Sequence, residues 1–379
     1  MPVPSLPLEV VGLIVEQVRL SCENDDSARR LNGLSIALVC RAWRDFGTGV
    51  VWYRLVLDSP EKACQEHETL SAVPHLAALV KEIDISKAKA LTVGARARAA
   101  TASAVHVDSL LLAFPTLQCV KLSADWVGTA VVLSALRHVP SLRVLFLDVT
   151  FPRLQAAPLT HQLQHLSSLV HLHVAGDFAD EETSAFPSPP TLLPLQDLTI
   201  RCASSPNPAS VQSFAMHLVK SIDPSTLRIL QIALLPPDEQ ILSEVARFPH
   251  LTVLVATFAG NAPRLYDQLL AMASFLPRLK VLCIAYCGIR QNLYSPSTPT
   301  LSSFLDSLPT IYLLSLPGFY FNPGNNETEL DPCRSAEYTV LRAVELRATA
   351  VAGDEAMVTY AKVQYRDGDV QWCQCGVGL

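Results

Sequence analysis

FPTLQCVKL, residues 114–122, contains a pattern that returns along most of this chain. Leu117, Val120 and Leu122 stand at the first, fourth and sixth positions of a six-residue unit, which Phe114-Pro115 precedes. Copies with the same spacing follow at Leu142/Leu145/Leu147, Leu169/Leu172/Val174, Leu195/Leu198/Ile200, Leu227/Leu230/Ile232, Leu251/Leu254/Ala256, Leu279/Leu282/Ile284 and Ile311/Leu314/Leu316, with weaker copies at Val80/Ile83/Ile85 and Leu341/Val344/Leu346. Self-similarity of this kind indicates a repeat architecture.

The segments between the copies favour helices. The first positions of successive copies lie from 24 (Leu227 to Leu251) to 37 (Val80 to Leu117) residues apart, which leaves room for a strand, a loop and a helix. Apolar residues at helical spacing predict helices over 101–114, 210–220, 238–248 and 264–276. Asp238 after Pro236-Pro237 suits a helix start, and the proline before most copies ends the preceding helix.

The predicted fold is α/β, a curved leucine-rich-repeat-like solenoid with a parallel sheet and outer helices. A single strand–helix pair cannot bury its apolar face alone, whereas stacked pairs share a continuous core. An ordinary doubly wound domain also alternates strands and helices. Ten copies of one strand motif, with no Gly-rich phosphate loop after any of them, favour the solenoid. The Pro- and Gly-containing stretches 176–194, 288–300 and 321–336 are predicted to be exposed loops.

Both ends of the chain depart from the repeat. Residues 1–57 predict a small helical module, with a helix over 8–20, a polar loop over 21–30 and helical spacing over 31–46 that breaks near Cys40. Residues 58–350 would form the solenoid, and residues 351–379 a cap with a β-hairpin over 358–374 that turns at Asp367-Gly368. Because Trp52-x-x-Leu55-x-Leu57 fits the repeat spacing, the first strand would begin near Trp52.

The helical module resembles an F-box. Ser5-Leu6-Pro7-Leu8-Glu9-Val10-Val11 is similar to the opening of that family, which reads leucine-proline-x-glutamate followed by apolar residues. Leu38-Val39-Cys40-Arg41-Ala42-Trp43-Arg44 is similar to its valine-cysteine-basic-x-tryptophan segment, and Trp52 followed by Leu55 to its closing tryptophan. The resemblance covers residues 5–57, and the arrangement as a whole resembles fungal F-box proteins that carry degenerate leucine-rich repeats.

This resemblance implies a partner and a role. F-box modules dock on the Skp-type adaptor of SCF ubiquitin ligases, which links them to a cullin, and the rest of the chain then holds a substrate protein. By position, the implied adaptor contacts are Leu6, Pro7, Leu8, Val10, Ile14, Val39, Cys40 and Trp43. The alternative is that these residues only pack the module against the first repeat. The chain would then be a scaffold for protein–protein interaction without ubiquitin chemistry.

Strand alternation predicts which residues of each copy face away from the core. If the fourth and sixth positions point inward, the third and fifth point outward. The first residues of this outward series are charged, Glu82, Asp84 and Lys121. Thr199 belongs to its middle part, and the residues further along the chain are apolar. Since rows of exposed apolar residues mark binding surfaces, we expect the substrate site at Ile229, Val253, Val255, Val281 and Leu313. The alternative is that a helix, a loop or the tail covers this row.

Composition and motifs argue against other classes of protein. A net charge of -6 and a pI of about 5.9 do not fit a general nucleic-acid binder, and no apolar stretch is long enough to predict a membrane span. The start lacks the pattern of a secretory signal, and the ten cysteines are scattered, which favours reduced thiols in the cytoplasm or nucleus.

We found no arrangement of residues that predicts catalysis. Cys373/Cys375 and Cys283/Cys287 lack the second pair that a zinc site needs, and a histidine group (His161, His165, His171 and His173) lacks further ligands. The sequence therefore predicts a binding protein without cofactor or metal, and no enzyme.

Overall fold

The computed structural model describes residues 7–22, 25–85, 111, 113–124, 132–178, 192–202, 208–235, 239–259, 275–287, 301–316, 328–329, 338–349, 355–365, 368 and 370–375. The chain divides into two compact units, one of residues 1–154 and 161–176, the other of residues 155–160 and 177–379. The domain boundaries at residues 57 and 350 were placed by sequence pattern. This division into two units does not test them, so they stay predictions.

The first unit begins with three helices, α1 (Leu8–Ser21), α2 (Asp26–Val39) and α3 (Arg41–Trp52). The predicted break near Cys40 is confirmed, since Cys40 is extended (φ -164°, ψ 174°) between α2 and α3. The loop predicted over 21–30 is too long. Asp25 caps α2 by accepting a hydrogen bond from the Ala28 backbone N–H at 3.0 Å, so the helix starts inside the charged stretch.

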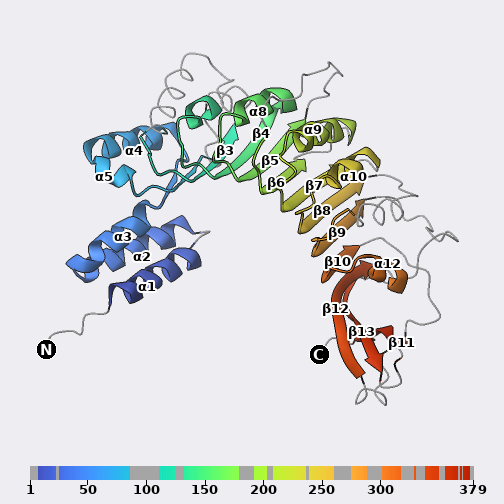
Figure 1. Cartoon of the computed structure of the whole chain (residues 1–379). Coiled ribbons are helices and arrows are strands. Elements are labelled where there is room, and N and C mark those ends of the chain that lie inside the picture. Colours follow the sequence, from blue (N-terminus) through green and yellow to red (C-terminus); the bar gives the residue numbers. More distant parts are fainter. Residues whose placement is uncertain are drawn as a thin grey trace. The chain divides into compact units, whose positions relative to one another are not determined.

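Short parallel strands follow the three helices in the first unit (Figure 1). The strand order is β1-β2-β3-β4-β5, and α4 and α5 lie between strands in sequence. The helix α8, whose first five residues belong to the second unit, follows β4 in sequence. Leu55, Ile83, Val120 and Leu145 pair across β1 to β4, so the fourth positions of the copies align as predicted. Trp52 itself ends α3. The elements are β1 (Arg54–Val56), α4 (Pro60–Ala72), α5 (Pro74–Ala77), β2 (Glu82–Asp84), β3 (Cys119–Ala124), β4 (Val144–Leu154), α8 (Ala156–Leu163) and β5 (His171–Phe178).

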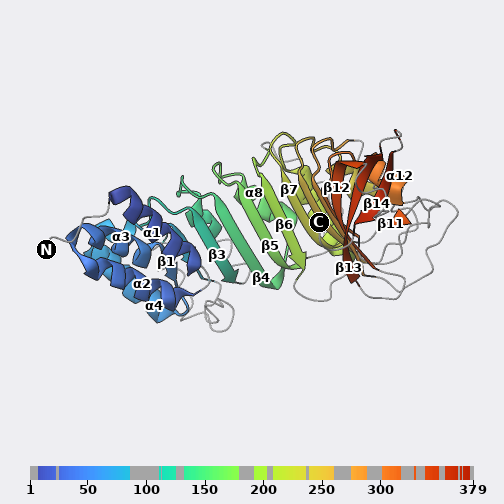
Figure 2. The same ribbon diagram turned by 90° about the horizontal axis from the view of Figure 1, so that it is seen from below.

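The second unit continues the same pattern of parallel strands. Leu198, Leu230, Leu254, Leu282 and Leu314 pair in one register across β6 to β10. The helices lie along one face of these strands in Figure 1, and Figure 2 shows the opposite face, here called the helix-free face. The elements are β6 (Asp197–Cys202), α9 (Pro208–Lys220), β7 (Ile229–Leu235), α10 (Glu239–Val245), β8 (Val253–Ala259), β9 (Val281–Cys287), α12 (Leu301–Ser307) and β10 (Leu313–Leu316).

Two of the four predicted helices can be compared with the structure, and both are confirmed, at α9 and α10. The segments 101–114 and 264–276 lie mostly outside the described residues. The core lies between strands and helices, because fourth and sixth positions such as Leu230 and Ile232 are buried together with Phe214 and Leu218 of α9. The strand β5 alternates half-buried and buried residues along its whole length, as the repeat predicted.

A recurrent turn explains the proline before each strand. In five repeats the carbonyl of the residue before proline accepts a hydrogen bond from the N–H three residues later, as in a β-turn. Proline suits the second position of such a turn because its ring presets φ and it lacks an N–H that would need a partner. The pairs are Phe114–Leu117, Val139–Leu142, Phe248–Leu251, Leu276–Leu279 and Leu308–Ile311.

A hydroxyl in several of these turns links each repeat to the one before it. The residue just before the first position of the motif donates to the carbonyl of the first position in the preceding repeat. Thr116 thus reaches the Val80 carbonyl at 3.3 Å, Ser141 that of Leu117 at 2.8 Å, Thr226 that of Leu195 at 2.9 Å and Thr310 that of Leu279 at 2.6 Å. The strand motif alone did not predict these bonds.

Replacing Thr310 by Val should remove one such link while keeping the side-chain shape. We expect a loss of about 1 kcal/mol in the free energy of unfolding, the usual net contribution of one hydrogen bond. Urea denaturation would measure it. Thr69→Val is the control, since the exposed Thr69 hydroxyl donates to the Gln65 carbonyl within its own helix and links no repeats. Equal effects of the two substitutions would show that the link between repeats adds no stability.

The C-terminal strands close the second unit. The predicted hairpin is confirmed by the antiparallel strands β13 (Glu355–Tyr365) and β14 (Val370–Cys375), with Gly368 at a φ of 88° between them. The short β11 (Thr328–Glu329) pairs with β14. Asp306 of α12 accepts hydrogen bonds from Trp372 Nε1 at 3.1 Å and from Lys362 Nζ at 2.6 Å. The hairpin is therefore held against the last helix of the repeats.

The last predicted copy of the motif is wrong in its register. The strand β12 (Tyr338–Thr349) pairs Leu346, predicted as a sixth position, with Leu314, which is a fourth position. This strand also pairs along most of its length with β13 in antiparallel fashion. The long antiparallel partner, which the motif does not encode, sets the register here. A shift by two residues keeps the same side chains on each face, so Val344 remains buried.

Candidate docking surfaces

The exposed apolar residues gather in the helical module of the first unit. Among the described residues, twelve large apolar side chains are exposed, and eight of them lie between residues 10 and 39. Isolated exposed apolar residues are common on protein surfaces, whereas a concentration of them marks an interaction site. These eight residues are Val10, Leu13, Ile14, Leu20, Leu31, Leu34, Leu38 and Val39.

The helix α1 carries an apolar stripe on its outer side. Val10, Leu13, Ile14 and Leu20 follow the spacing of one helical face, and the Leu13 side chain is 71% exposed. Val11, on the opposite side, is fully buried. The helix therefore packs through a narrow line of contacts and leaves its wider apolar face to solvent.

The helix α2 has the same property. Leu31, Leu34 and Leu38 recur at intervals of three and four residues, and Leu38 is 85% exposed. Gly33 and Ile36, on the other side of the helix, are buried. Two neighbouring helices thus each present leucines to water.

The structure places several of the implied adaptor contacts at the surface. Pro7 is exposed just before α1, and Val10, Ile14, Val39 and Cys40 are also exposed. Trp43 is half-buried on α3, Leu8 is the first residue of α1, and Leu6 lies outside the described residues. Reasoning from the family segments missed Leu13, Leu20, Leu31, Leu34 and Leu38. A helical wheel of each segment would have placed these residues on one side of its helix, but it would not have shown that this side faces water.

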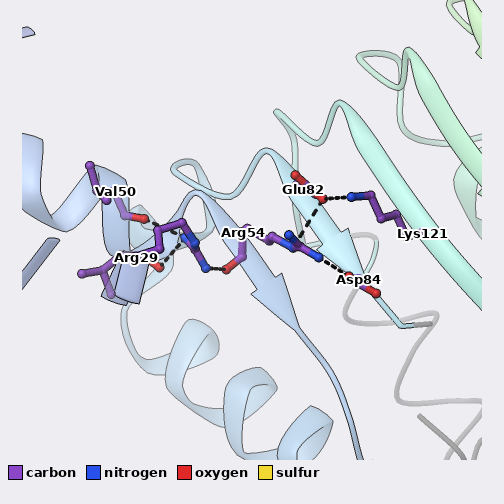
Figure 3. A network of polar contacts seen from close by, with 7 residues as sticks. Arg29, Val50, Arg54, Glu82, Asp84 and Lys121 are labelled. Carbon is purple, nitrogen blue, oxygen red and sulfur yellow. Dashed lines mark hydrogen bonds and ion pairs between the residues drawn. The ribbon is translucent and has the colours of Figure 1, made fainter. Parts of the chain in front are cut away.

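A buried arginine joins the helical module to the first strand (Figure 3). Arg29 of α2 is 2% exposed. Its guanidinium donates to the carbonyls of Val50 at 2.7 Å, Val51 at 3.2 Å and Arg54 at 2.7 Å. The last carbonyls of a helix lack partners within the helix and carry partial negative charge, so a cation there satisfies and stabilises the end of α3.

Charged residues on β1, β2 and β3 form a second polar network beside it (Figure 3). Arg54 Nε lies 3.4 Å from Glu82 Oε1, and Lys121 Nζ lies 2.9 Å from the same oxygen. The Arg54 guanidinium also pairs with the Asp84 carboxylate. Asp84 lies in this network with Glu82 and Lys121, in agreement with the outward side that strand alternation predicted, but it is not exposed. The carboxylate is buried, which is tolerated because the Arg54 guanidinium compensates its charge. Thr199, also predicted outward, is buried as well.

Two glycines allow α2 and α3 to pack closely. A Cβ atom on Gly47 would lie 2.4 Å from the Ala37 nitrogen and 2.5 Å from the Gly33 carbonyl oxygen. A Cβ atom on Gly33 would meet the Gly47 carbonyl oxygen at 3.0 Å. The two helix backbones therefore touch at a point where no side chain fits.

Beyond the charged network, the outward residues of β3 to β5 become aromatic. Lys121 Nζ lies 5.3 Å from the centre of the Phe146 ring, and the rings of Phe146 and His173 are 5.5 Å apart. Cys119 lies beside Lys121 on β3, and burial, with a smaller effect of Glu82, raises the pKa of its thiol to about 12. The thiol is therefore protonated at neutral pH and a poor nucleophile.

The apolar outward residues of the second unit form one row. Ile229, Val253, Val281 and Leu313 pair in direct register across β7, β8, β9 and β10, and each is half-buried. Val255 belongs to the next row, between Gln231 and Cys283. The structure thus brings together all five residues that the sequence predicted for this surface. Each keeps part of its surface exposed.

The part of the chain that the structure describes holds no group of three or more His, Cys, Asp or Glu side chains that could bind a metal ion. His171 and His173 share one face of β5, and the rings of His161 and His165 meet edge to face at 5.5 Å. In the same described ranges, none of the helices combines the length and apolar character needed to span a membrane.

Comparisons with known proteins add little to this geometry. No protein-family model matches the chain, and no curated protein matches it. Among solved structures, the crystal structure of the TLR13–ssRNA13 complex is similar at 15% sequence identity and a TM-score of 0.37. The match covers 75% of this chain and 42% of the other, so the chain spans less than half of its length.

Proposed function

We propose that this chain is a substrate receptor of an SCF-type ubiquitin ligase. The helical module docks on a Skp-type adaptor, and the repeats hold a substrate protein near the ligase. In this role the chain transfers no group itself and contributes only proximity. The resemblance of residues 5–57 to the F-box supports the adaptor, and the row of apolar residues on the second unit supports a protein substrate.

The observation that carries this proposal is the exposed apolar surface of α1 and α2. Burying one leucine side chain contributes about 1.5–3 kcal/mol, so a partner that covers three of these leucines gains roughly 5 kcal/mol or more before the costs of association. Leu13, Leu34 and Leu38 are each more than half exposed, and any stabilisation from them requires a second protein. A groove that accepts amphipathic helices provides such a partner.

One observation favours the alternative, a repeat scaffold whose helical module serves as an N-terminal cap. Arg29 binds the Arg54 carbonyl on β1, so the module is tied to the first strand of the sheet. A cap requires this link, and the link is also compatible with a docking module. The two functions differ in the exposed leucines of α1 and α2, because a cap does not require them and a docking module does.

Leu34→Asp combined with Leu38→Asp tests the docking surface. In the full-length protein, this double substitution should weaken binding to a purified Skp-type adaptor at least about 100-fold, since two buried apolar contacts become charges. Titration calorimetry measures the affinity. Phe275→Asp is the matched control, because Phe275 is also exposed and apolar but lies outside the module. Both sites are exposed, so we expect the variants to fold.

A second readout on the same complex uses the Cys40 thiol. Cys40 is exposed between α2 and α3, within the implied contact set, so the adaptor should slow its alkylation as followed by peptide mass spectrometry. Loss of binding in the double variant, with protection of Cys40 in the unchanged protein, supports the ligase receptor. If the full-length protein is folded and binds no adaptor, the ligase role is excluded and the function as a repeat scaffold is favoured.

A further inference from the structure

The apolar row on the helix-free face has a defined length. It runs across four adjacent strands, from Ile229 on β7 to Leu313 on β10. Acidic residues bracket it in the same register, Asp197 on β6 and Glu345 on β12. At about 4.8 Å between strands, the apolar part covers roughly 14 Å. An α-helix of about ten residues has that length.

The spacing of the row favours a helix over an extended segment. Side chains on one face of an extended peptide recur every 6.6–6.8 Å or so, which does not match the distance of about 4.8 Å between strands. Successive turns of an α-helix place side chains about 5.4 Å apart. A helix lying along the row therefore sets one apolar side chain against each strand, with Val253 and Val281 at the centre.

Two exposed basic residues, Arg228 and Lys280, directly precede Ile229 and Val281 of the row. The residue before each member of the row has a backbone carbonyl that accepts hydrogen bonds from the next strand. The Arg228 carbonyl accepts the N–H groups of Thr252 and Val253, and the Lys280 carbonyl those of Tyr312 and Leu313. The Arg228 and Lys280 side chains are exposed, and no carboxylate of the described residues pairs with either of them. In the next row, two positions further along each strand, Gln231, Val255, Cys283 and Ser315 are uncharged.

We infer that the helix-free face of β7 to β10 receives an amphipathic helix of a partner protein, with acidic residues along one flank of its apolar stripe. The inference rests on the proposed function, in that it names the class of substrate that the receptor would hold. The apolar stripe would cover the row from Ile229 to Leu313, and the acidic flank would face Arg228 and Lys280. Opposite charges across such a contact set the orientation of the helix and its choice of partner.

Labelled synthetic peptides test this inference on the full-length protein by fluorescence anisotropy. One peptide has leucines at helical spacing and glutamates along one flank. A second has lysines in place of the glutamates, and a third carries a central proline that prevents the helix. We expect the glutamate peptide to bind at least about 10-fold more tightly than either of the others, with a gain of helical circular dichroism on binding.

Protein variants assign the binding to this face. Val253→Asp with Val281→Asp should abolish binding of the glutamate peptide. Arg228→Glu with Lys280→Glu, at exposed positions that leave the fold intact, should reverse the order of the glutamate and lysine peptides. Leu34→Asp with Leu38→Asp should leave peptide binding unchanged, so failure of this surface can be told apart from failure of adaptor docking. Equal binding of all three peptides, or an unchanged order in the Arg228→Glu, Lys280→Glu variant, would overturn the inference.

A second copy of the chain is the competing occupant of this face. Analytical sedimentation would show whether the chain self-associates. If it does, and if Val253→Asp with Val281→Asp removes the self-association, the row belongs to a homodimer interface and the inference is overturned. A monomer that binds the glutamate peptide supports it.

Discussion

Arg29→Ala should cost the first unit about 3–5 kcal/mol of its free energy of unfolding, because three carbonyls lose their donor. The buried Val50 acceptor left unsatisfied costs about 1–3 kcal/mol, and the two part-buried acceptors, of Val51 and Arg54, cost less each. The guanidinium, on a residue that is 2% exposed, binds the carbonyls of Val50 and Val51 at the end of α3 and the carbonyl of Arg54 on β1. Urea denaturation followed by far-ultraviolet circular dichroism would measure the loss.

Two further substitutions show whether charge or geometry matters at this site. Arg29→Lys keeps the charge but cannot direct donors to three carbonyls at once, so we expect an intermediate loss. Arg30→Ala is the control on the neighbouring residue. The Arg30 side chain is 36% exposed and lies 3.8 Å from Glu66, and we expect its loss to cost at most about 1 kcal/mol. If Arg29→Ala costs no more than Arg30→Ala, the guanidinium does not hold the end of α3.

Gly47→Ala should destabilise the helical module by about 1–2 kcal/mol net, because overpacking usually costs roughly 1–3 kcal/mol. The added Cβ would lie 2.4 Å from the Ala37 nitrogen and 2.8 Å from its Cα. These are backbone atoms of α2, so the two helices must separate to admit the methyl group. The gain in helix propensity from glycine to alanine, about 1 kcal/mol, offsets only part of this cost.

Gly49→Ala is the matched control two residues further along the same helix. No atom lies within 4 Å of a Cβ placed on Gly49, so only the gain in helix propensity remains. We therefore expect opposite signs, with Gly47→Ala lowering and Gly49→Ala raising the melting temperature measured by calorimetry. A rise in both variants would mean that α2 and α3 do not pack through these glycines.

The sequence predicted the repeat well because each repeat obeys the same local rules. Alternation along a strand buries the fourth and sixth positions, and parallel neighbours place equivalent residues side by side. Leu198, Leu230, Leu254, Leu282 and Leu314 pair as their spacing indicated, and so do the half-buried residues of the apolar row. Once the period is known, the register of such strands follows.

The prediction was weaker where partners distant in the sequence decide the outcome. The strand β12 shifts its register because it also pairs with β13, and Asp84 is buried because Arg54 neutralises it. Arg29 lies in a charged stretch that resembled a loop, and its role depends on carbonyls more than twenty residues away. Patterns within a short window carry no information on such contacts.

The sequence by itself determined the repeat period, the inward and outward faces of the strands, and the C-terminal hairpin. Only the tertiary structure decided which leucines of α1 and α2 face water and which charges lie buried. The reason is physical: a helix with apolar residues on more than one side can bury any of them, and the packing of its neighbours selects which. The close approach of α2 and α3 at Gly47 makes that selection here.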